Sequence, residues 1–256
     1  MSYLNKMFGL QNKVALVTGA GRGLGRGMAI ALARAGAFVI LLGRNKERLQ
    51  DTQQLLQTEG LQADFFSVDI TDRSTLTKVI DTILKKHQKI DILVNNAGII
   101  RRAPAVEYSD EDWQAVIETN LNALFFLCRE VGKTMVARGS GKIINIASLL
   151  SFQGGITVPA YAAAKGGVAQ LTKALANEWA RSNVQVNAIA PGYFETDNTK
   201  ALRENPTRNK EITSRIPAGR WGEADDLAGA VIFLASEASN YVNGHILVVD
   251  GGWMAR

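Results

Sequence analysis

A tyrosine and a lysine four positions apart, Tyr161 and Lys165, form the clearest chemical pair in the 256-residue sequence. In a helical segment this spacing puts both side chains on one face, about one turn apart. A phenol has a pKa of roughly 10 and is a poor base at neutral pH, but a neighbouring ammonium favours the phenolate. The pair therefore predicts a general acid/base at Tyr161, with its pKa lowered by Lys165.

Two polar residues earlier in the chain fit the same chemistry. Ser148 follows an apolar segment thirteen residues before Tyr161, where its hydroxyl could hydrogen-bond a substrate oxygen. Asn120 interrupts an apolar helical segment and could hold a water of a proton relay. Each has an ordinary structural explanation, since a Tyr-x-x-x-Lys pair is common on helices and a mid-helix Asn can simply satisfy a neighbouring carbonyl. The hypothesis rests on all of them occurring in this order.

A glycine-rich segment near the N-terminus predicts a dinucleotide site. Thr18–Gly25 follows an apolar run and precedes a helical segment, and glycine there lets the backbone turn and approach a pyrophosphate at the helix N-terminus. Arg26 and Met28 stand where a third glycine of the G-x-G-x-x-G spacing would be needed, so the pattern is T-G-x-x-x-G-x-G. Its place after the first strand favours cofactor binding over a mere strand–helix corner. We expect contacts from Gly19, Arg22, Gly23, Leu24 and Gly25.

The end of the second apolar run bears on the type of cofactor. A carboxylate normally stands there and binds the adenosine ribose, whereas this run ends in Gly43 and Arg44. Arg44 and Arg22 could both pair with a 2′-phosphate, which slightly favours NADP. Exposed arginines are often only surface charge, so the prediction stays NAD(P).

Further cofactor contacts are expected where later strands end, because ligands collect at the carboxyl ends of parallel strands. Asp69 could accept a hydrogen bond from the adenine amino group. The segment Asn95–Gly98 offers amide groups and a small backbone to the ribose, although it is also a good turn. We therefore add to the predicted cofactor site Asp69, Ile70, Asn96, Ala97 and Gly98.

The elements that must position these residues alternate regularly. Short apolar, β-branched runs alternate with helical stretches, which predicts right-handed βαβ units and a parallel sheet with helices on both faces. Seven strands are expected, over Val14–Val17, Phe38–Leu42, Asp64–Val68, Ile90–Val94, Gly141–Ala147, Val184–Ile189 and His245–Val249. We predict one α/β domain over residues 1–256, a doubly wound Rossmann-type sheet.

The segment from about residue 193 to residue 217 breaks this alternation. It is polar, charged and rich in Asn, Thr and Arg. A solvated connection is the alternative, but a loop of this length in a compact domain is usually functional. We therefore expect a substrate lid or substrate loop there.

Composition narrows the classes of function. The chain has 29 Lys and Arg against 24 Asp and Glu, without a long basic tract, so we expect no nucleic-acid partner. The first ten residues lack the apolar stretch of a signal peptide, and no segment approaches the ~18 apolar residues of a membrane span, so we expect neither secretion nor a membrane partner. The lone Cys128 suits a reducing cytoplasm. His87 and His245 form no ligand cluster, so no metal is predicted.

Taken together, these motifs resemble the short-chain dehydrogenase/reductase family over nearly the full chain. The resemblance rests on Thr18–Gly25, Asn95–Gly98, Asn120, Ser148, Tyr161, Lys165, Pro191 and Gly192. It implies a Rossmann-type domain, usually a homotetramer, that transfers a hydride between NAD(P) and a secondary alcohol or ketone.

The resemblance also implies the roles of the site residues. Tyr161 would be the general acid/base, Lys165 would lower its pKa and bind the nicotinamide ribose, Ser148 would orient the substrate, and Asn120 would support the proton relay. Pro191, Gly192 and Thr196 would contact the cofactor, Thr196 at its carboxamide.

A narrower resemblance concerns segments expected around the substrate mouth. Asn95–Arg102, Ala147–Gly155, Ala190–Tyr193 and Arg215–Gly222 are similar to family members that act as 5-dehydrogenases on 2-dehydro-3-deoxy-D-gluconate in pectin and uronate breakdown. This implies a sugar-acid substrate and favours NAD. Its carboxylate and hydroxyls would suit charged and amide partners. Besides Ser148 and Tyr161, the candidate substrate contacts are Arg101, Arg102, Gln153, Asn198 and Arg203.

Other functions remain open from the sequence. A gluconate 5-dehydrogenase and a 3-oxoacyl carrier-protein reductase are the nearest alternatives in the family, and the polar, arginine-bearing lid favours a small anionic sugar over an acyl chain. A catalytically silent dinucleotide-binding scaffold is the alternative from another class. The intact Ser148, Tyr161 and Lys165 argue against it.

Overall fold

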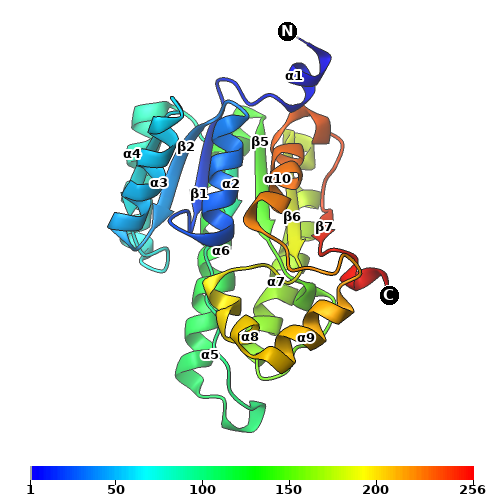
Figure 1. The fold of residues 1–256 in the computed structure, drawn as a ribbon. Helices are drawn as coiled ribbons and strands as arrows, with labels where there is room; N and C mark the ends of the chain where they lie inside the picture. The colour runs from blue at the N-terminus through cyan, green and yellow to red at the C-terminus, as the bar shows by residue number, and fades with distance from the viewer. Residues whose placement is uncertain (1) are drawn as a thin grey trace.

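A seven-stranded parallel sheet forms the centre of the protein, which we describe from a computed structural model covering residues 2–256 (Figure 1). The strand order is β3-β2-β1-β4-β5-β6-β7, and all six neighbouring pairs are parallel. The strands are β1 Val14–Thr18, β2 Phe38–Gly43, β3 Ala63–Ser67, β4 Ile92–Asn95, β5 Gly141–Ile146, β6 Val184–Pro191 and β7 Ile246–Val249. The predicted doubly wound α/β fold is confirmed, and each predicted strand overlaps an observed one.

Helices cover both faces of the sheet, which is why the strands are apolar almost throughout. Leu16 and Val17 are neighbours in β1 and point to opposite faces, and both are fully buried. Leu16 packs in the core that includes residues of α4 (Arg73–His87), α6 (Ala123–Arg138) and α7 (Pro159–Trp179). Val17 packs in the core that includes residues of α2 (Gly23–Arg34), α3 (Lys46–Thr58) and α10 (Ala228–Ala235).

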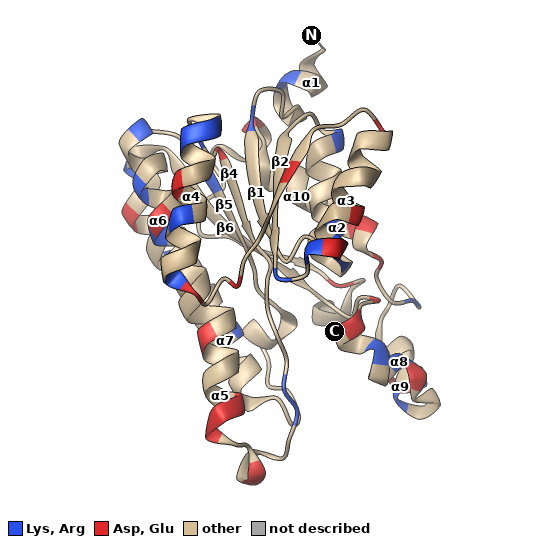
Figure 2. Cartoon of the chain, turned by 90° about the vertical axis from the view of Figure 1, so that its left-hand side faces the viewer, with Lys and Arg blue, Asp and Glu red and all other residues tan. Residues whose placement is uncertain are grey.

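Charged residues lie mainly on the helices and connections, while the strands carry few (Figure 2). Local polar contacts set several helix starts. The side chain of Asn45 accepts a hydrogen bond from the backbone N–H of Arg48 at the start of α3, and that of Asp72 accepts one from Thr75 at the start of α4.

Within residues 2–256, every helix is too short or too polar to span a bilayer.

The remaining helices lie outside these two layers. They are α1 Tyr3–Phe8, α5 Asp110–Ile117, α8 Lys200–Glu204 and α9 Pro206–Arg215, and a π-helical turn over Glu118–Asn122 joins α5 to α6. In Figure 1, α8 and α9 lie beyond the end of the sheet where β1 passes into α2. This is the carboxyl end of the strands, where parallel sheets of this kind bind ligands.

The segment 193–217, for which we expect a lid or loop from its polar composition, is largely helical. Asn205 accepts a hydrogen bond from the backbone N–H of Arg208, and Pro206 occupies the first turn of α9, so the local sequence starts a helix efficiently. Ile212 and Ile216 then pack against Trp221 and other apolar side chains. These contacts to distant parts of the chain hold a segment whose own composition is polar.

Candidate active site

A cavity of about 1560 Å³ opens at the carboxyl end of the sheet. Its wall combines the glycine-rich turn, the ends of β2, β4, β5 and β6, the first turns of α7, and much of the 193–217 segment. Many of the candidate site residues were predicted to lie at these strand ends. Most of the candidates line this one cavity.

The glycine-rich turn requires glycine for two reasons, the backbone conformation at Gly19 and Gly23 and the lack of space at Gly25. Gly19 and Gly23 have φ values of +67° and +52°, in the left-handed region that favours glycine. A Cβ at Gly25 would lie 2.3 Å from both Asn96 Nδ2 and the carbonyl oxygen of Gly19. At Gly23, by contrast, the nearest atom to an added Cβ is Thr196 Cγ2, at 3.7 Å. The turn thus exposes backbone to the cavity and fits a pyrophosphate at the start of α2.

Thr18 ties this turn to the end of β4, a role the sequence reasoning missed. Its Oγ1 accepts hydrogen bonds from the backbone N–H groups of Asn96 and Ala97, both at 3.0 Å. The side chain of Asn96 donates in return to the carbonyl oxygen of Thr18, at 2.9 Å. The two predicted cofactor segments therefore form one unit, and the only sequence signal was the Thr at the start of the glycine pattern.

Asp69 lines the cavity just beyond the end of β3 and pairs with Arg44. The distance from Arg44 Nη1 to Asp69 Oδ2 is 3.7 Å. Burial alone would raise the pKa of Asp69, but hydrogen bonds from the backbone and hydroxyl of Thr71, and the charge of Arg44, bring this pKa below its usual value. Asp69 is thus an ionised acceptor at neutral pH.

Arg22 also pairs with a carboxylate rather than standing free. Its guanidinium donates to Asp197 Oδ2, and Arg48 Nη1 of α3 lies 3.8 Å from the same oxygen. The two arginines that could favour NADP, Arg22 and Arg44, therefore each face an aspartate in this structure.

Tyr161 and Lys165 share one face of α7, as their spacing predicts. Lys165 Nζ lies 5.7 Å from the centroid of the Tyr161 ring and donates a hydrogen bond to the carbonyl oxygen of Ile146, the last residue of β5. Lys165 is only 4% exposed. Ser148 follows β5, and its Oγ caps a short turn by accepting from the backbone N–H of Leu150 at 3.2 Å. All three side chains line the cavity.

The predicted lowering of the Tyr161 pKa is wrong for this structure. Burial raises the pKa of the phenol, and a hydrogen bond with Ser148 and the charge of Arg102 oppose this only in part. Burial also lowers the pKa of Lys165 to about 8. The lysine ammonium is held by the Ile146 carbonyl, and desolvation of the phenolate outweighs the nearby positive charge.

Asn120 lies in the π-helical turn and holds the backbone of Ile99. Its Oδ1 accepts from the Ile99 N–H and its Nδ2 donates to the Ile99 carbonyl, both at 2.8 Å. Thr119 lines the cavity, whereas Asn120 lies behind the wall and is 1% exposed. These contacts match the ordinary structural explanation for Asn120, in which a mid-helix Asn satisfies a neighbouring backbone carbonyl. π-Helical turns of this kind often occur at functional sites.

Four of the five additional substrate candidates line the cavity, namely Arg102, Gln153, Asn198 and Arg203. Arg102 Nη2 donates to the carbonyl oxygen of Asn198 at 3.3 Å, and Arg203 Nη1 lies 3.2 Å from Glu195 Oε2. The first contact links the β4 side of the cavity to the 193–217 segment, and the second lies within that segment.

Arg101 is the exception, because the structure does not bring it to the cavity. Its Nε lies 3.1 Å from Asp112 Oδ1, and it is not part of the cavity wall. The first turn of α5 carries three acidic residues, Asp110–Asp112, which attract the guanidinium away from the site. The side-chain direction of two adjacent arginines could not be read from the sequence.

The cavity wall also contains residues that the sequence reasoning did not name. Arg208 and Arg215 of α9 and Trp253 near the C-terminus all line it. The guanidinium carbon of Arg215 lies 3.9 Å from the centroid of the Trp253 ring. The only available signal was the likeness of Arg215–Gly222 to sugar-acid dehydrogenases. Within residues 2–256, no group of three or more His, Cys, Asp or Glu side chains is arranged to hold a metal ion.

Comparisons with known proteins agree with this geometry. A family model described as enoyl-(acyl carrier protein) reductase matches residues 19–254. The chain is 55% identical to 2-dehydro-3-deoxy-D-gluconate 5-dehydrogenase of Bacillus subtilis strain 168, over 256 residues and 100% of both chains. It is 55% identical to the enzyme of the same name from Pseudoalteromonas atlantica strain T6c, over 97% of this chain and 98% of that one.

A solved structure extends the likeness to three dimensions. The gluconate 5-dehydrogenase of Burkholderia cenocepacia J2315, in complex with NADP and tartrate, superimposes with a TM-score of 0.96 at 43% identity. The match covers 99% of this chain and 100% of that one.

Proposed function

Because this chain belongs to the short-chain dehydrogenase/reductase family, we propose that it is an NAD(P)-dependent 5-dehydrogenase of 2-dehydro-3-deoxy-D-gluconate. The observation that carries the proposal is the 55% identity to enzymes of that name over essentially the whole chain. The cavity supports it, because a backbone cradle, a partly buried phenol and several arginines line the same space.

The cofactor would lie along the carboxyl edge of the sheet and supply the hydride acceptor or donor. The backbone of Gly19–Gly25 would hold the pyrophosphate, with Arg22 and Leu24 beside it. Asp69 and Ile70 would contact the adenine. Asn96, Ala97 and Gly98 would lie near the adenosine ribose, and Lys165 would bind the nicotinamide ribose. The remaining proposed contacts are Pro191, Gly192 and Thr196, with Thr196 at the carboxamide.

NADP is the cofactor that the local chemistry favours slightly, because Arg22 and Arg44 suit a 2′-phosphate. The related structures with bound NADP support this, whereas the narrower likeness to sugar-acid dehydrogenases favours NAD. We propose that the protein accepts both.

The chemical step would use the protein's own proton carriers. Tyr161 would take or give the proton of the substrate oxygen, and Ser148 would orient that oxygen by a hydrogen bond. Lys165 stays largely an ammonium at pH 7, because its pKa of about 8 lies above that pH. Asn120 would act by fixing the Ile99 backbone beside the cofactor site and by supporting a proton relay.

The substrate carboxylate and hydroxyls would bind between β4 and the 193–217 segment. Arg102 and Arg203 supply positive charge there, and Gln153 and Asn198 supply amide groups. We propose that the protein is a single domain and that the segment 193–217 acts as a lid over its cavity.

We also propose that the protein is a homotetramer in the cytoplasm. Strand β7 lies at the edge of the sheet, so its outer edge is open for packing against another subunit.

A substrate panel tests this function. The purified protein is assayed with 2-dehydro-3-deoxy-D-gluconate, gluconate and a 3-oxoacyl thioester, each with NAD(H) and NADP(H) in the appropriate redox state, by the absorbance of the reduced nicotinamide. We expect the highest kcat/KM with 2-dehydro-3-deoxy-D-gluconate. A higher value with gluconate or the thioester would reassign the substrate, and cofactor binding without any turnover would favour the scaffold alternative.

A further inference from the structure

Asp197 connects the 193–217 segment to two arginines at the adenosine end of the cavity. Its Oδ2 pairs with Arg22 of the glycine turn and lies 3.8 Å from Arg48 Nη1 of α3. The glycine turn packs directly on α3 here, since a Cβ at Gly21 would lie 3.1 Å from Arg48 Cβ. Two arginines from different elements therefore meet at one carboxylate of the predicted lid.

This cluster lies where an adenosine 2′-phosphate would bind. In dinucleotide folds the group at the end of the second strand meets the ribose 2′ position, and Arg44 follows β2 directly. Arg22, Arg44 and Arg48 all line the same cavity as Asp69 and Asp197. Three guanidinium groups thus face two carboxylates, so most of the positive charge is already compensated within the protein.

We propose that Asp197 determines cofactor specificity by competing with the 2′-phosphate of NADP for Arg22 and Arg48. NAD carries only a neutral hydroxyl at this position and leaves the contact of Asp197 with the two arginines intact. The inference rests on the proposed function, because it requires that the protein bind nicotinamide dinucleotides. It goes beyond that function by assigning the NAD-to-NADP balance to a residue of the lid.

The charge and exposure of these side chains allow the Asp197 carboxylate and a phosphate to replace each other on Arg22 and Arg48. A phosphate monoester carries roughly −1.5 to −2 charges at neutral pH and binds guanidinium forks well, so it can replace a carboxylate. The side chains of Arg22, Arg48 and Asp197 are 56%, 50% and 60% exposed, and exposed ion pairs exchange readily. Asp197 therefore reduces the advantage of NADP without excluding it.

Replacing Asp197→Asn tests the proposal by binding rather than by turnover. The change keeps the shape of the side chain, removes its charge, and frees Arg22 and Arg48 for the phosphate. At fixed ionic strength, isothermal titration calorimetry should show the Kd for NADP falling at least about threefold, with the Kd for NAD changing less than about twofold. The same gain should appear with adenosine 2′,5′-bisphosphate and be absent with AMP, which carries no 2′-phosphate.

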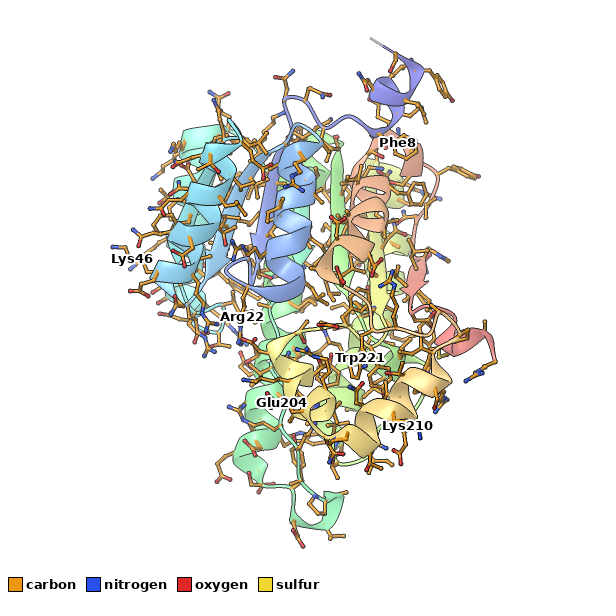
Figure 3. All side chains as sticks on the ribbon, in the orientation of Figure 1. Phe8, Arg22, Lys46, Glu204, Lys210 and Trp221 are labelled. Atoms are coloured by element: carbon orange, nitrogen blue, oxygen red, sulfur yellow. The ribbon has the colours of Figure 1, made fainter. Side chains whose placement is uncertain are left out.

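Glu204→Gln provides the matched control. Glu204 is an exposed carboxylate of α8, labelled in Figure 3, and its Oε1 lies 3.6 Å from Lys200 Nζ rather than near the arginine cluster. The control should leave both Kd values unchanged. In an Arg48→Met background the gain from Asp197→Asn should shrink, because one of the two cations that it frees is gone.

Three results would overturn the proposal. Asp197→Asn could weaken the binding of both cofactors equally, which would mean that Asp197 helps to hold any bound nucleotide. It could strengthen the binding of both equally, which would indicate an effect on lid opening, or it could leave both Kd values unchanged. Failure of the wild-type protein to bind either cofactor would reject the proposed function and this inference together, whereas the other three results reject this inference alone.

Discussion

Lys165 lies beside Tyr161 but is held by the end of β5. Its Nζ is 5.7 Å from the Tyr161 ring centroid and donates to the carbonyl oxygen of Ile146. The ammonium is therefore fixed in position next to the phenol, while burial keeps the pKa of the phenol above its usual value. Any lowering of the Tyr161 pKa must therefore come from groups that enter the cavity.

This relationship predicts how the cofactor-free protein titrates. Since the pKa of Tyr161 is raised, the phenol should remain protonated through neutral pH and ionise only above about 10. A tyrosinate absorbance titration of the wild-type protein, minus that of Tyr161→Phe, isolates this group. A difference signal that develops below pH 9 would show instead that the charge of Lys165 outweighs burial.

The glycine turn predicts a sharp contrast between two Gly→Ala changes. A Cβ at Gly25 would lie 2.3 Å from Asn96 Nδ2 and from the Gly19 carbonyl oxygen, so Gly25→Ala must displace the turn that faces the cofactor. Overpacking of this kind costs about 1–3 kcal/mol, and the Kd for NADP should rise about tenfold.

Gly229→Ala is the matched control for that change. Gly229 lies in α10, and an added Cβ there meets nothing within 4 Å. Its cofactor affinity should equal that of the wild type, and its melting temperature should rise slightly, because Ala is the better helix former. Equal cofactor affinity in both variants would contradict the assignment of the turn to the pyrophosphate.

Replacing Asn120 should lower the stability of the protein, whereas replacing Asn122 in the same π-helical turn should not. Asn120→Ala leaves the N–H and the carbonyl of Ile99 without their partners, both now at 2.8 Å. The free energy of unfolding should fall by about 2 kcal/mol or more, and turnover should fall with it. Asn122→Ala removes only a hydrogen bond to Glu118, so denaturant unfolding should show little change for it. Similar unfolding curves for Asn120→Ala and the wild type would exclude this positioning role.

The fold could be predicted from the sequence because buried parallel strands leave a direct pattern. Runs such as Val14–Val17 and Phe38–Leu42 are apolar on both faces, and glycine and asparagine clusters mark where they end. Strand ends in such a sheet converge on one edge, so Ser148, Asn96 and the glycine turn could be placed together without coordinates.

The features that escaped prediction depend on contacts between distant residues. Arg101 and Arg102 are adjacent, but acidic residues at the start of α5 turn Arg101 away from the cavity. The helices of the 193–217 segment are held by Trp221 and Trp253, which come later in the chain. The pKa of Tyr161 depends on how deeply its hydroxyl is buried, which spacing along a helix does not reveal.

The most direct test of the account is the turnover of Tyr161→Phe with 2-dehydro-3-deoxy-D-gluconate, measured together with its Kd for NADP and NAD. The substitution removes only the hydroxyl, so the aromatic packing of the ring against Lys165 is kept. We predict that kcat falls about 10²-fold to 10⁴-fold, while both cofactor Kd values stay within about threefold of the wild type. Near-native turnover in this variant would contradict the assignment of Tyr161 as the proton carrier.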